Sequence, residues 1–233
     1  MLSIVLIEPE TPGNIGAVGR AMANFSFNNL VLVNPKCDHL SGEAVQRAKR
    51  AKTLLKKAKL LRSFNDLKSW DYLIGTTGNI GSSYNILRSP MTPEQLGEKM
   101  CSLVKSKVAL ILGREGNGLT NAEIAQCDFT VTIATSPKYS SLNISHALAI
   151  LLYEIFKASK KKKIGQHIIP LPRNEKTHLL RKINATIDAL PFTSERRRNT
   201  QRSVWKRLIG KSLPTRREGH TLMGFFEKIK RDR

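Results

Sequence analysis

Val108-Ala-Leu-Ile-Leu-Gly-Arg-Glu-Gly-Asn-Gly118 joins a run of five apolar residues to a loop that contains three glycines. A short, uninterrupted apolar run that ends at glycine is typical of a strand buried on both faces, as in parallel sheets. Glycine lets the following backbone approach a ligand closely, and ligands of open α/β sheets bind at the carboxyl ends of the strands. This stretch therefore predicts a parallel sheet with a ligand-binding loop at one strand end.

The same alternation of apolar runs and helix-like stretches covers the first two thirds of the chain. Further strand candidates are residues 3–7, 30–33, 72–74 and 129–133. Between the strand candidates lie stretches with helix formers or helical apolar spacing, at residues 17–25, 42–61, 93–104, 121–127 and 143–157. Strands that alternate with crossover helices predict an α/β fold built on a parallel sheet.

A change of composition marks the end of this domain. Four consecutive lysines occupy residues 160–163, and Pro170 and Pro172 follow; a charge run with prolines is typical of a linker. We place the boundary near residue 160, which divides the chain into residues 1–160 and 161–233. Helical periodicity at residues 175–190, 194–209 and 218–230 predicts that the second part is a small α-helical C-terminal module.

The charge of the chain favours a polyanionic partner. Its 233 residues include 39 Lys and Arg against 18 Asp and Glu, a formal net charge of +21. The excess is concentrated at the end, since residues 1–157 hold 18 basic and 12 acidic residues and residues 158–233 hold 21 and 6. With no membrane-type amphipathic segment in the sequence, we expect the partner to be nucleic acid.

Composition also excludes several classes of protein. No apolar run approaches the roughly 18 residues of a membrane span, and no basic leader precedes the first apolar run, so we expect a cytoplasmic protein. Cys37, Cys101 and Cys127 are scattered and odd in number, which fits buried thiols and neither a disulfide framework nor a zinc ribbon. The histidines show no ligand spacing, and we expect no metal.

Four loops at predicted strand ends could bind a ligand: residues 12–20, 75–78, 113–118 and 134–143. The glycines of the first loop, Gly13, Gly16 and Gly19, are spaced three and three, which is not the dinucleotide-binding pattern. No Gly-Lys-Ser or Gly-Lys-Thr triplet closes any of these loops, so a phosphate-cradling P-loop is excluded. Ser140 and Ser141 fit either a ligand site or the cap of the helix that follows.

Three ordered motifs carry a resemblance to a known family. They are Asn14-Ile-Gly-Ala-Val-Gly-Arg20, Ile111-Leu-Gly-Arg-Glu-Gly-Asn-Gly-Leu119 and Ser140-Ser-Leu-Asn-Ile-Ser-His146. Residues 1–157 resemble the SPOUT superfamily of RNA methyltransferases, specifically the SpoU or TrmH-type ribose 2′-O-methyltransferases and, among those, the TrmJ group. The resemblance implies a C-terminal trefoil knot in this domain, an S-adenosyl-L-methionine pocket within the knot, and a homodimer whose active site is completed across the interface.

The resemblance also assigns residues to roles. By position, the cofactor-binding residues are Thr76, Thr77, Gly78, Gly113, Gly118, Ile133, Ser140, Ser141 and Leu142. The catalytic candidates are Arg20, Asn14, Glu115, Ser141 and Asn143. In the family the arginine that matches Arg20 is proposed to take or relay the proton of the ribose hydroxyl. Because a guanidinium normally stays protonated, orientation of that hydroxyl and its phosphate is an equal alternative for Arg20.

Two groups of basic residues are candidates for an RNA surface. One is Arg47, Lys49, Arg50, Lys52, Lys56, Lys57 and Lys59, and the other is Arg196, Arg197, Arg198, Arg202, Lys206, Arg207, Arg216 and Arg217. Cations contact phosphates, and aromatic side chains stack on unpaired bases. Trp205 lies among basic residues and fits either base stacking or the core of the C-terminal module.

Taken with the resemblance, the sequence predicts a metal-independent tRNA ribose 2′-O-methyltransferase that acts on nucleotide 32 of the anticodon loop. Two alternatives stay open. The same chemistry could serve ribosomal RNA, since relatives with these motifs act there. A non-catalytic RNA-binding protein could keep the fold, although the joint presence of Asn14, Arg20, Glu115, Ser141 and Asn143 argues against it.

Overall fold

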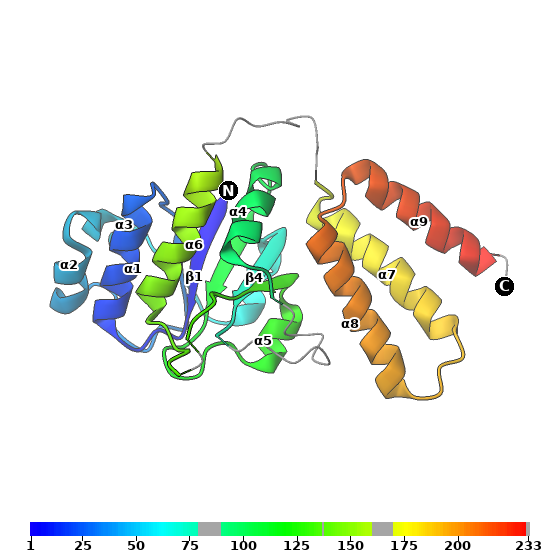
Figure 1. Cartoon of the computed structure of the whole chain (residues 1–233), viewed down its shortest axis with the longest axis horizontal. Helices are drawn as coiled ribbons and strands as arrows, with labels where there is room; N and C mark the ends of the chain where they lie inside the picture. Colours follow the sequence, from blue (N-terminus) through cyan, green and yellow to red (C-terminus); the bar gives the residue numbers. More distant parts are fainter. Residues whose placement is uncertain (79–89, 137, 160–169, 232–233) are drawn as a thin grey trace. The chain divides into compact units, whose positions relative to one another are not determined.

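The computed structural model describes residues 1–78, 90–136, 138–159 and 170–231 of the chain (Figure 1). These residues form two compact units, Met1–Ile164 and Gly165–Arg233. The predicted boundary near residue 160 falls in a stretch that lies outside the described residues. Each unit has its own hydrophobic core.

A parallel sheet forms the centre of the first unit, in the order β3-β2-β1-β5-β4-β6. Its strands are β1 (Leu2–Ile7), β2 (Leu30–Val33), β3 (Lys59–Leu61), β4 (Tyr72–Thr76), β5 (Val108–Leu112) and β6 (Phe129–Val131). β1 and β5 are adjacent at the middle of the sheet and are buried along their whole length. The predicted α/β fold with a parallel sheet is confirmed.

Helices cover both faces of the sheet. Figure 1 shows α1 (Pro12–Asn24), α6 (Ile144–Ser159) and α4 (Pro93–Ser102) side by side on one face, and α6 packs on both of its neighbours. On the other face, apolar residues of the 3₁₀ helix η2 (Phe64–Ser69) and of α5 (Asn121–Gln126) pack on alternate residues of the strands, including Val5, Ile7 and Ile111. Burial of both faces explains why the strands read as nearly continuous apolar runs.

The predicted helix over residues 42–61 is interrupted at residues 49–51 and ends at Lys56. This stretch forms α2 (Gly42–Ala48), the 3₁₀ turn η1 (Lys49–Ala51), α3 (Lys52–Lys56) and then β3. Lys49 ends α2 with a φ of 53°, a left-handed value that no helix interior adopts. β3 is a short edge strand whose Lys59 and Leu60 are exposed, so it has no buried apolar run to identify it.

The prediction of a ligand loop at residues 12–20 is also wrong, because residues 12–24 form the helix α1. Its glycines serve helix packing. A Cβ on Gly16 would lie 2.2 Å from the carbonyl oxygen of Ala44 in α2, and one on Gly19 would lie 2.5 Å from Cδ1 of Leu55 in α3. The spacing of three and three therefore places small residues where α1 meets its neighbours.

The expectation that all three cysteines are buried holds only for Cys127, since Cys37 and Cys101 are half-buried. Cys37 follows β2 in a loop, and Cys101 lies near the end of α4. None of the three forms a disulfide within the described parts of the chain. The chain path between Gly78 and Pro90 lies outside the described residues, and the trefoil knot stays a prediction.

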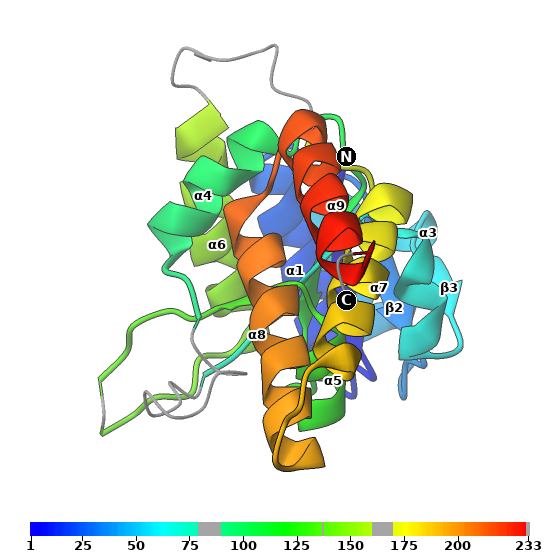
Figure 2. The same ribbon diagram turned by 90° about the vertical axis from the view of Figure 1, so that its right-hand side faces the viewer.

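The described residues of the second unit, 170–231, form three helices (Figure 2), namely α7 (Arg173–Ala189), α8 (Glu195–Ser212) and α9 (Arg216–Arg231). They agree with the predicted helical module. Their apolar residues form one core, which includes Leu179, Ile183 and Ile187 of α7 and Phe226 of α9. None of the helices in the described parts of the chain is long and apolar enough to span a membrane.

Candidate active site

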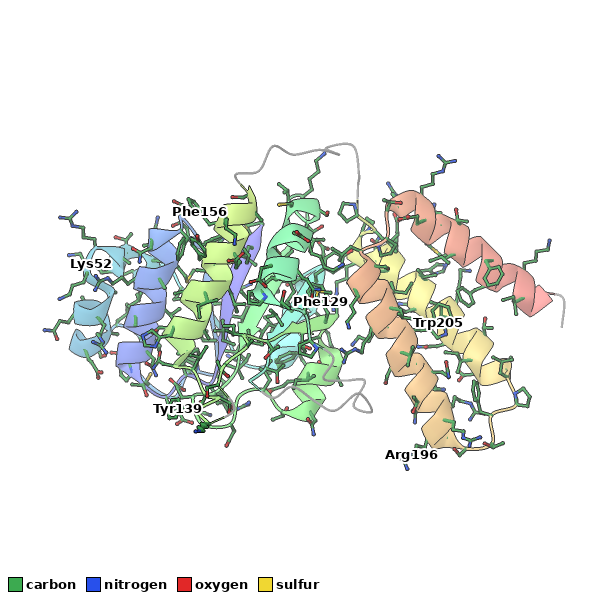
Figure 3. All side chains as sticks on the ribbon, viewed as in Figure 1. Lys52, Phe129, Tyr139, Phe156, Arg196 and Trp205 are labelled. Atoms are coloured by element: carbon green, nitrogen blue, oxygen red, sulfur yellow. The ribbon has the colours of Figure 1, made fainter. Side chains whose placement is uncertain are left out.

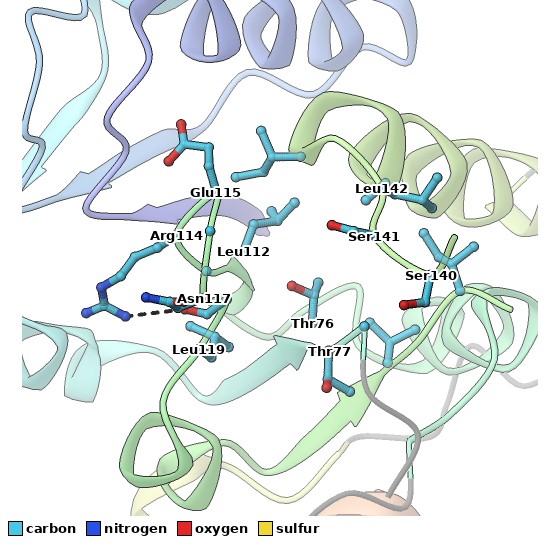
Figure 4. Close-up of a pocket in the computed structure, with 18 of the residues that line it drawn as sticks. Thr76, Thr77, Leu112, Arg114, Glu115, Asn117, Leu119, Ser140, Ser141 and Leu142 are labelled. Carbon is cyan, nitrogen blue, oxygen red and sulfur yellow. Dashed lines mark hydrogen bonds between the residues drawn. The ribbon is translucent and has the colours of Figure 1, made fainter. Parts of the chain in front are cut away.

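A cavity of about 330 Å³ opens at the carboxyl ends of β4, β5 and β6, beside the start of α6 (Figure 4). Such a volume suits a small-molecule ligand. All nine predicted cofactor residues line it: Thr76, Thr77, Gly78, Gly113, Gly118, Ile133, Ser140, Ser141 and Leu142. The cavity therefore gathers three of the four predicted ligand loops at one place in the sheet.

The loop after β5 forms one wall of the cavity as a tight turn. Arg114 and Gly118 exchange backbone hydrogen bonds, with N···O distances of 3.2 and 3.0 Å. Gly118 has a φ of 65°, which favours glycine. A Cβ on Gly113 would lie 2.1 Å from the carbonyl carbon of Gly118, so only glycine fits there. Gly113 and Gly118 thus allow the backbone of the turn to close on itself beside the cavity.

Arg114 fixes this turn from outside, and the sequence analysis did not single it out. Its Nε donates to Glu8 at 2.6 Å, Nη1 and Nη2 each donate to Glu123 at 3.0 Å, and Nη1 also reaches the carbonyl oxygen of Gly118 at 3.3 Å. Figure 4 shows the Arg114 side chain directed away from Ser141. The signal available in the sequence was an arginine at the end of β5 with an acidic residue, Glu8, at the end of β1.

These ion pairs shift the pKa of all three groups. The bond to Glu123 raises the pKa of the Arg114 guanidinium further above its ordinary value. Hydrogen bonds from Arg114 and Asn34 lower the pKa of Glu8. Burial opposes ionisation of Glu123, but hydrogen bonds from Arg114 and Thr120 outweigh it and lower the pKa of that carboxyl as well. All three groups are therefore charged near neutral pH.

The carboxylate of Glu115, the next residue of the turn, binds the start of α1. Its carboxylate accepts hydrogen bonds from the backbone N–H groups of Glu10 and Thr11 at 3.2 to 3.3 Å, and from Nδ2 of Asn14 at 3.4 Å. A carboxylate at a helix N-terminus also interacts favourably with the helix dipole. Glu115 thereby joins the turn after β5 to α1.

A second pair of hydrogen bonds extends this connection to α6. Asn143 donates from Nδ2 to Oδ1 of Asn14 at 2.9 Å, and its own Oδ1 accepts from the backbone N–H of Ser145 at 2.9 Å. Asn143 therefore caps α6, which leaves the hydroxyls of Ser140 and Ser141 free of that role. Figure 4 shows the Ser141 hydroxyl directed toward the cavity.

Arg20 lies apart from the other four catalytic candidates. It is exposed, makes no hydrogen bond or ion pair with any described residue, and does not line the cavity. Arg20 follows Asn14 by six residues on α1, which separates their Cα atoms by about 9 Å along the helix and about 120° around it. Within one chain, the cavity and Arg20 are separate features.

The remaining lining of the cavity is largely apolar. The second and third motifs supply Leu112, Gly116, Asn117, Leu119 and Ile144, whereas Val131, Ala147 and Leu151 come from positions that no motif marked. Arg114 and Glu115 are the charged residues of the lining. An apolar floor with polar backbone at its rim suits a ligand that combines an aromatic base with polar groups. No group of three or more potential metal ligands occurs in the described parts of the chain.

Comparisons with known proteins agree with this geometry. Residues 1–153 match the model of the SpoU rRNA Methylase family. The tRNA (cytidine-2′-O-)-methyltransferase TrmJ of Methanocaldococcus jannaschii is 35% identical over 229 residues, which cover 97% of this chain and 99% of the relative. The crystal structure of TrmJ from Z. mobilis superimposes with a TM-score of 0.69 at 25% identity, and the match covers 99% of each chain.

A more distant structure shares the fold. It is the SpoU methyltransferase AviRb of Streptomyces viridochromogenes, solved in complex with the cofactor AdoMet. The TM-score is 0.54 at 22% identity, over 67% of this chain and 60% of AviRb. The match covers about as much of this chain as the α/β unit does, which indicates that this unit is the part the two proteins share.

Proposed function

This chain belongs to the SpoU rRNA Methylase family, and we propose that it transfers a methyl group from S-adenosylmethionine to the ribose 2′-hydroxyl of nucleotide 32 in tRNA. The observation that carries the proposal is the full-length similarity to a tRNA (cytidine-2′-O-)-methyltransferase, at 35% identity over 97% of the chain. The cavity at the carboxyl ends of β4, β5 and β6 is the site for the cofactor.

The residues of the cavity suit S-adenosylmethionine. The apolar lining suits an adenine ring, and Thr76, Thr77 and Ser141 add polar atoms to the cavity. The bound cofactor supplies an electrophilic sulfonium methyl group. The role of the chain is to hold that group and the ribose in line and to exclude water.

The hydrogen bonds of Glu115, Asn14 and Asn143 position the walls of this site. They join the turn after β5, the start of α1 and the start of α6, which come from the three sequence motifs. We assign Asn14, Asn143 and Glu115 as positioning residues. Ser141 lines the cavity beside them and would contact the cofactor or the ribose.

Arg20 enters the reaction from a second copy of the chain in this proposal. α1 and α6 pack together, and their outer side carries Phe25, Phe156 and the exposed side chains of Ile150 and Tyr153. An exposed apolar patch of this kind favours burial against a partner. A homodimer formed through this face would complete the site with Arg20, whose guanidinium would orient the 2′-hydroxyl and its phosphate.

RNA contacts extend beyond the site. All seven basic residues of the first predicted group, from Arg47 to Lys59, are exposed on α2, η1, α3 and β3. Figure 3 shows Lys52 directed outward from this edge of the unit. We assign this surface and the helical unit to phosphate binding. The reaction needs no metal in this proposal, and it takes place in the cytoplasm.

Transfer of a labelled methyl group tests the function. The purified chain is incubated with S-adenosylmethionine and, in parallel, with unmodified tRNA and ribosomal RNA, and the product nucleosides are then identified. A 2′-O-methylated nucleoside from tRNA supports the proposal. Label in ribosomal RNA alone would assign the second substrate. A chain that binds RNA but shows neither transfer nor a thermal shift with S-adenosylmethionine would be a non-catalytic RNA-binding protein.

A further inference from the structure

Trp205, which lies among basic residues of the C-terminal module, is packed inside the module and is not available to stack on RNA. Trp205 of α8 packs against Phe226 of α9, with ring centroids 5.3 Å apart and ring planes at 89°. Figure 3 shows Trp205 among the helices of this unit. Phe226 is 6% exposed, and both rings belong to the core or pack against it. Trp205 is therefore a core residue.

The neighbouring ring has the opposite environment. Phe225 is 58% exposed on α9, although a phenylalanine ring gains free energy when it is removed from water. Arg217, Thr221, Gly224 and Lys228 are exposed and lie within about 60° of one another around the helix axis, and Phe225 lies within about 100° of each of them. We call these five residues the α9 face.

The charges of the α9 face are available to a ligand. Arg217 and Lys228 form no ion pair with any described residue. Both carboxylates of α9 are engaged, since Glu218 accepts from the backbone N–H of Thr215 at 2.6 Å and Glu227 pairs with Lys182. Positive charge on this face is therefore not neutralised from its own helix.

Three other arginines of the unit form ion pairs. Arg198 pairs with Glu195, Arg202 with Asp188 and Glu195, and Arg216 with Glu175. These cations hold the three helices together or stabilise their turns. The α9 face therefore combines positive charges that form no ion pair with an exposed aromatic ring.

Gly224 adds a third observation. Glycine in the middle of a helix is unfavourable, and at this position no atom lies within 4 Å of the place that a Cβ would occupy. Packing within the described parts of the chain therefore does not require glycine there. A flat ligand that lies against the helix backbone beside Phe225 does require it.

We propose that the α9 face is a binding site for unpaired RNA, in which one base stacks on Phe225 over Gly224 and the flanking phosphates bind Arg217 and Lys228. Stacking on an aromatic ring between cations is how proteins bind single-stranded nucleic acid. The inference rests on the proposed function for the identity of the RNA as tRNA. Base stacking itself does not depend on methyl transfer.

Binding to RNA tests the site in the full-length chain. The probes are an anticodon stem-loop, a single-stranded RNA and an RNA duplex of equal length. Phe225→Leu keeps the apolar character and removes the ring, so it should weaken binding to the first two probes by about 5-fold or more and leave the duplex unchanged. Phe225→Tyr should bind as the unmodified chain does. Leu208→Ala is the matched control, because Leu208 is 52% exposed on α8.

Two further variants separate binding from folding. Gly224→Leu should raise the melting temperature, since leucine favours the helix, while it weakens RNA binding. Arg217→Ala and Lys228→Ala should each reduce the slope of log K against log salt concentration by about 0.7. A merely structural role for this face would not produce opposite changes in stability and affinity.

The outcomes distinguish this inference from the proposed function. Equal RNA affinity for Phe225→Leu and the unmodified chain would overturn the α9 face even if tRNA is methylated. Loss of binding in that variant, in a chain that methylates no tRNA, would support the face and reject the proposed function. A change of oligomeric state in Phe225→Leu, with RNA affinity unchanged, would identify the face as a contact between copies and overturn the proposal.

Discussion

Asn143 donates a hydrogen bond from Nδ2 to Oδ1 of Asn14 over 2.9 Å, joining two residues that are 129 positions apart in the chain. Because Asn14 also donates to Glu115 and Asn143 accepts from the N–H of Ser145, each amide group has one defined orientation. The contact connects the first and third motifs without either residue lining the cavity. It indicates that these asparagines act by holding α1 and α6 in place.

Asn14→Asp tests that role. The substitution keeps the shape of the side chain but replaces the Nδ2 donor with a carboxylate oxygen beside Glu115. We expect a loss of about 1–3 kcal/mol in the free energy of unfolding, and a fall in kcat that exceeds any change in cofactor affinity. Denaturant unfolding and steady-state kinetics measure both. Asn65→Asp on η2, at an exposed position, is the control; equal behaviour of the two variants would contradict the assignment.

Arg114→Ala tests the turn that forms the cavity wall. Removal of the guanidinium takes away the ion-pair partner of Glu123, leaves Glu8 with Lys36 and Asn34, and releases the bond to the carbonyl of Gly118. We expect affinity for S-adenosylmethionine to fall about tenfold, while tRNA affinity stays unchanged, because Arg114 is not among the residues proposed to bind RNA. Calorimetry and filter binding give the two affinities. Lys68→Ala removes an exposed cation of η2 and should change neither; full cofactor affinity in Arg114→Ala would refute the role.

Stability should depend on pH through the same ion pairs. The pKa values of Glu8 and Glu123 are lowered from 4.5 in the folded chain. A carboxyl with a lowered folded pKa stabilises the fold above its unfolded pKa and loses that contribution as pH falls through the folded value. The melting temperature should therefore decline below about pH 4.5, and less steeply in Glu8→Gln. Parallel curves for the two proteins would show that this pair contributes nothing.

Gly16→Ala tests the packing of α1 on α2. A methyl group there would lie 2.2 Å from the carbonyl oxygen of Ala44, which belongs to backbone and cannot turn aside. We expect a loss of about 1–3 kcal/mol in the free energy of unfolding. Gly42→Ala is the matched control, because no atom lies within 4 Å of its Cβ position. A Gly16→Ala variant as stable as the control would contradict the packing argument.

The sequence predicted the sheet well because its central strands are short, buried apolar runs, as residues 108–112 are. It failed at β3, where an edge strand within a lysine-rich stretch has no buried run, and at α1, where glycines that serve helix packing looked like a ligand loop. Motifs marked the glycine and serine loops of the cavity. They did not mark Ala147 and Leu151, because lining from a helix face depends on how α6 packs rather than on local sequence.

Side-chain partners were also beyond sequence reasoning. The resemblance grouped Asn14 with Arg20 as catalytic candidates, but the helix turns Arg20 to another side, and Asn14 forms hydrogen bonds with Glu115 and Asn143. Trp205 and Phe225 both occur among basic residues, and burial alone distinguishes the core ring from the exposed one. Hydrogen-bond partners that are more than a hundred positions apart in the chain can be identified only from the fold.

Mapping of the methylated position tests the central claim most directly. Unmodified tRNA is treated with the chain and labelled S-adenosylmethionine, digested, and analysed by mass spectrometry, with Arg20→Ala in parallel. We predict one added methyl group on the ribose of nucleotide 32, and loss of this product in Arg20→Ala with the cofactor still bound. A methyl group on a base, or undiminished transfer by Arg20→Ala, would contradict it.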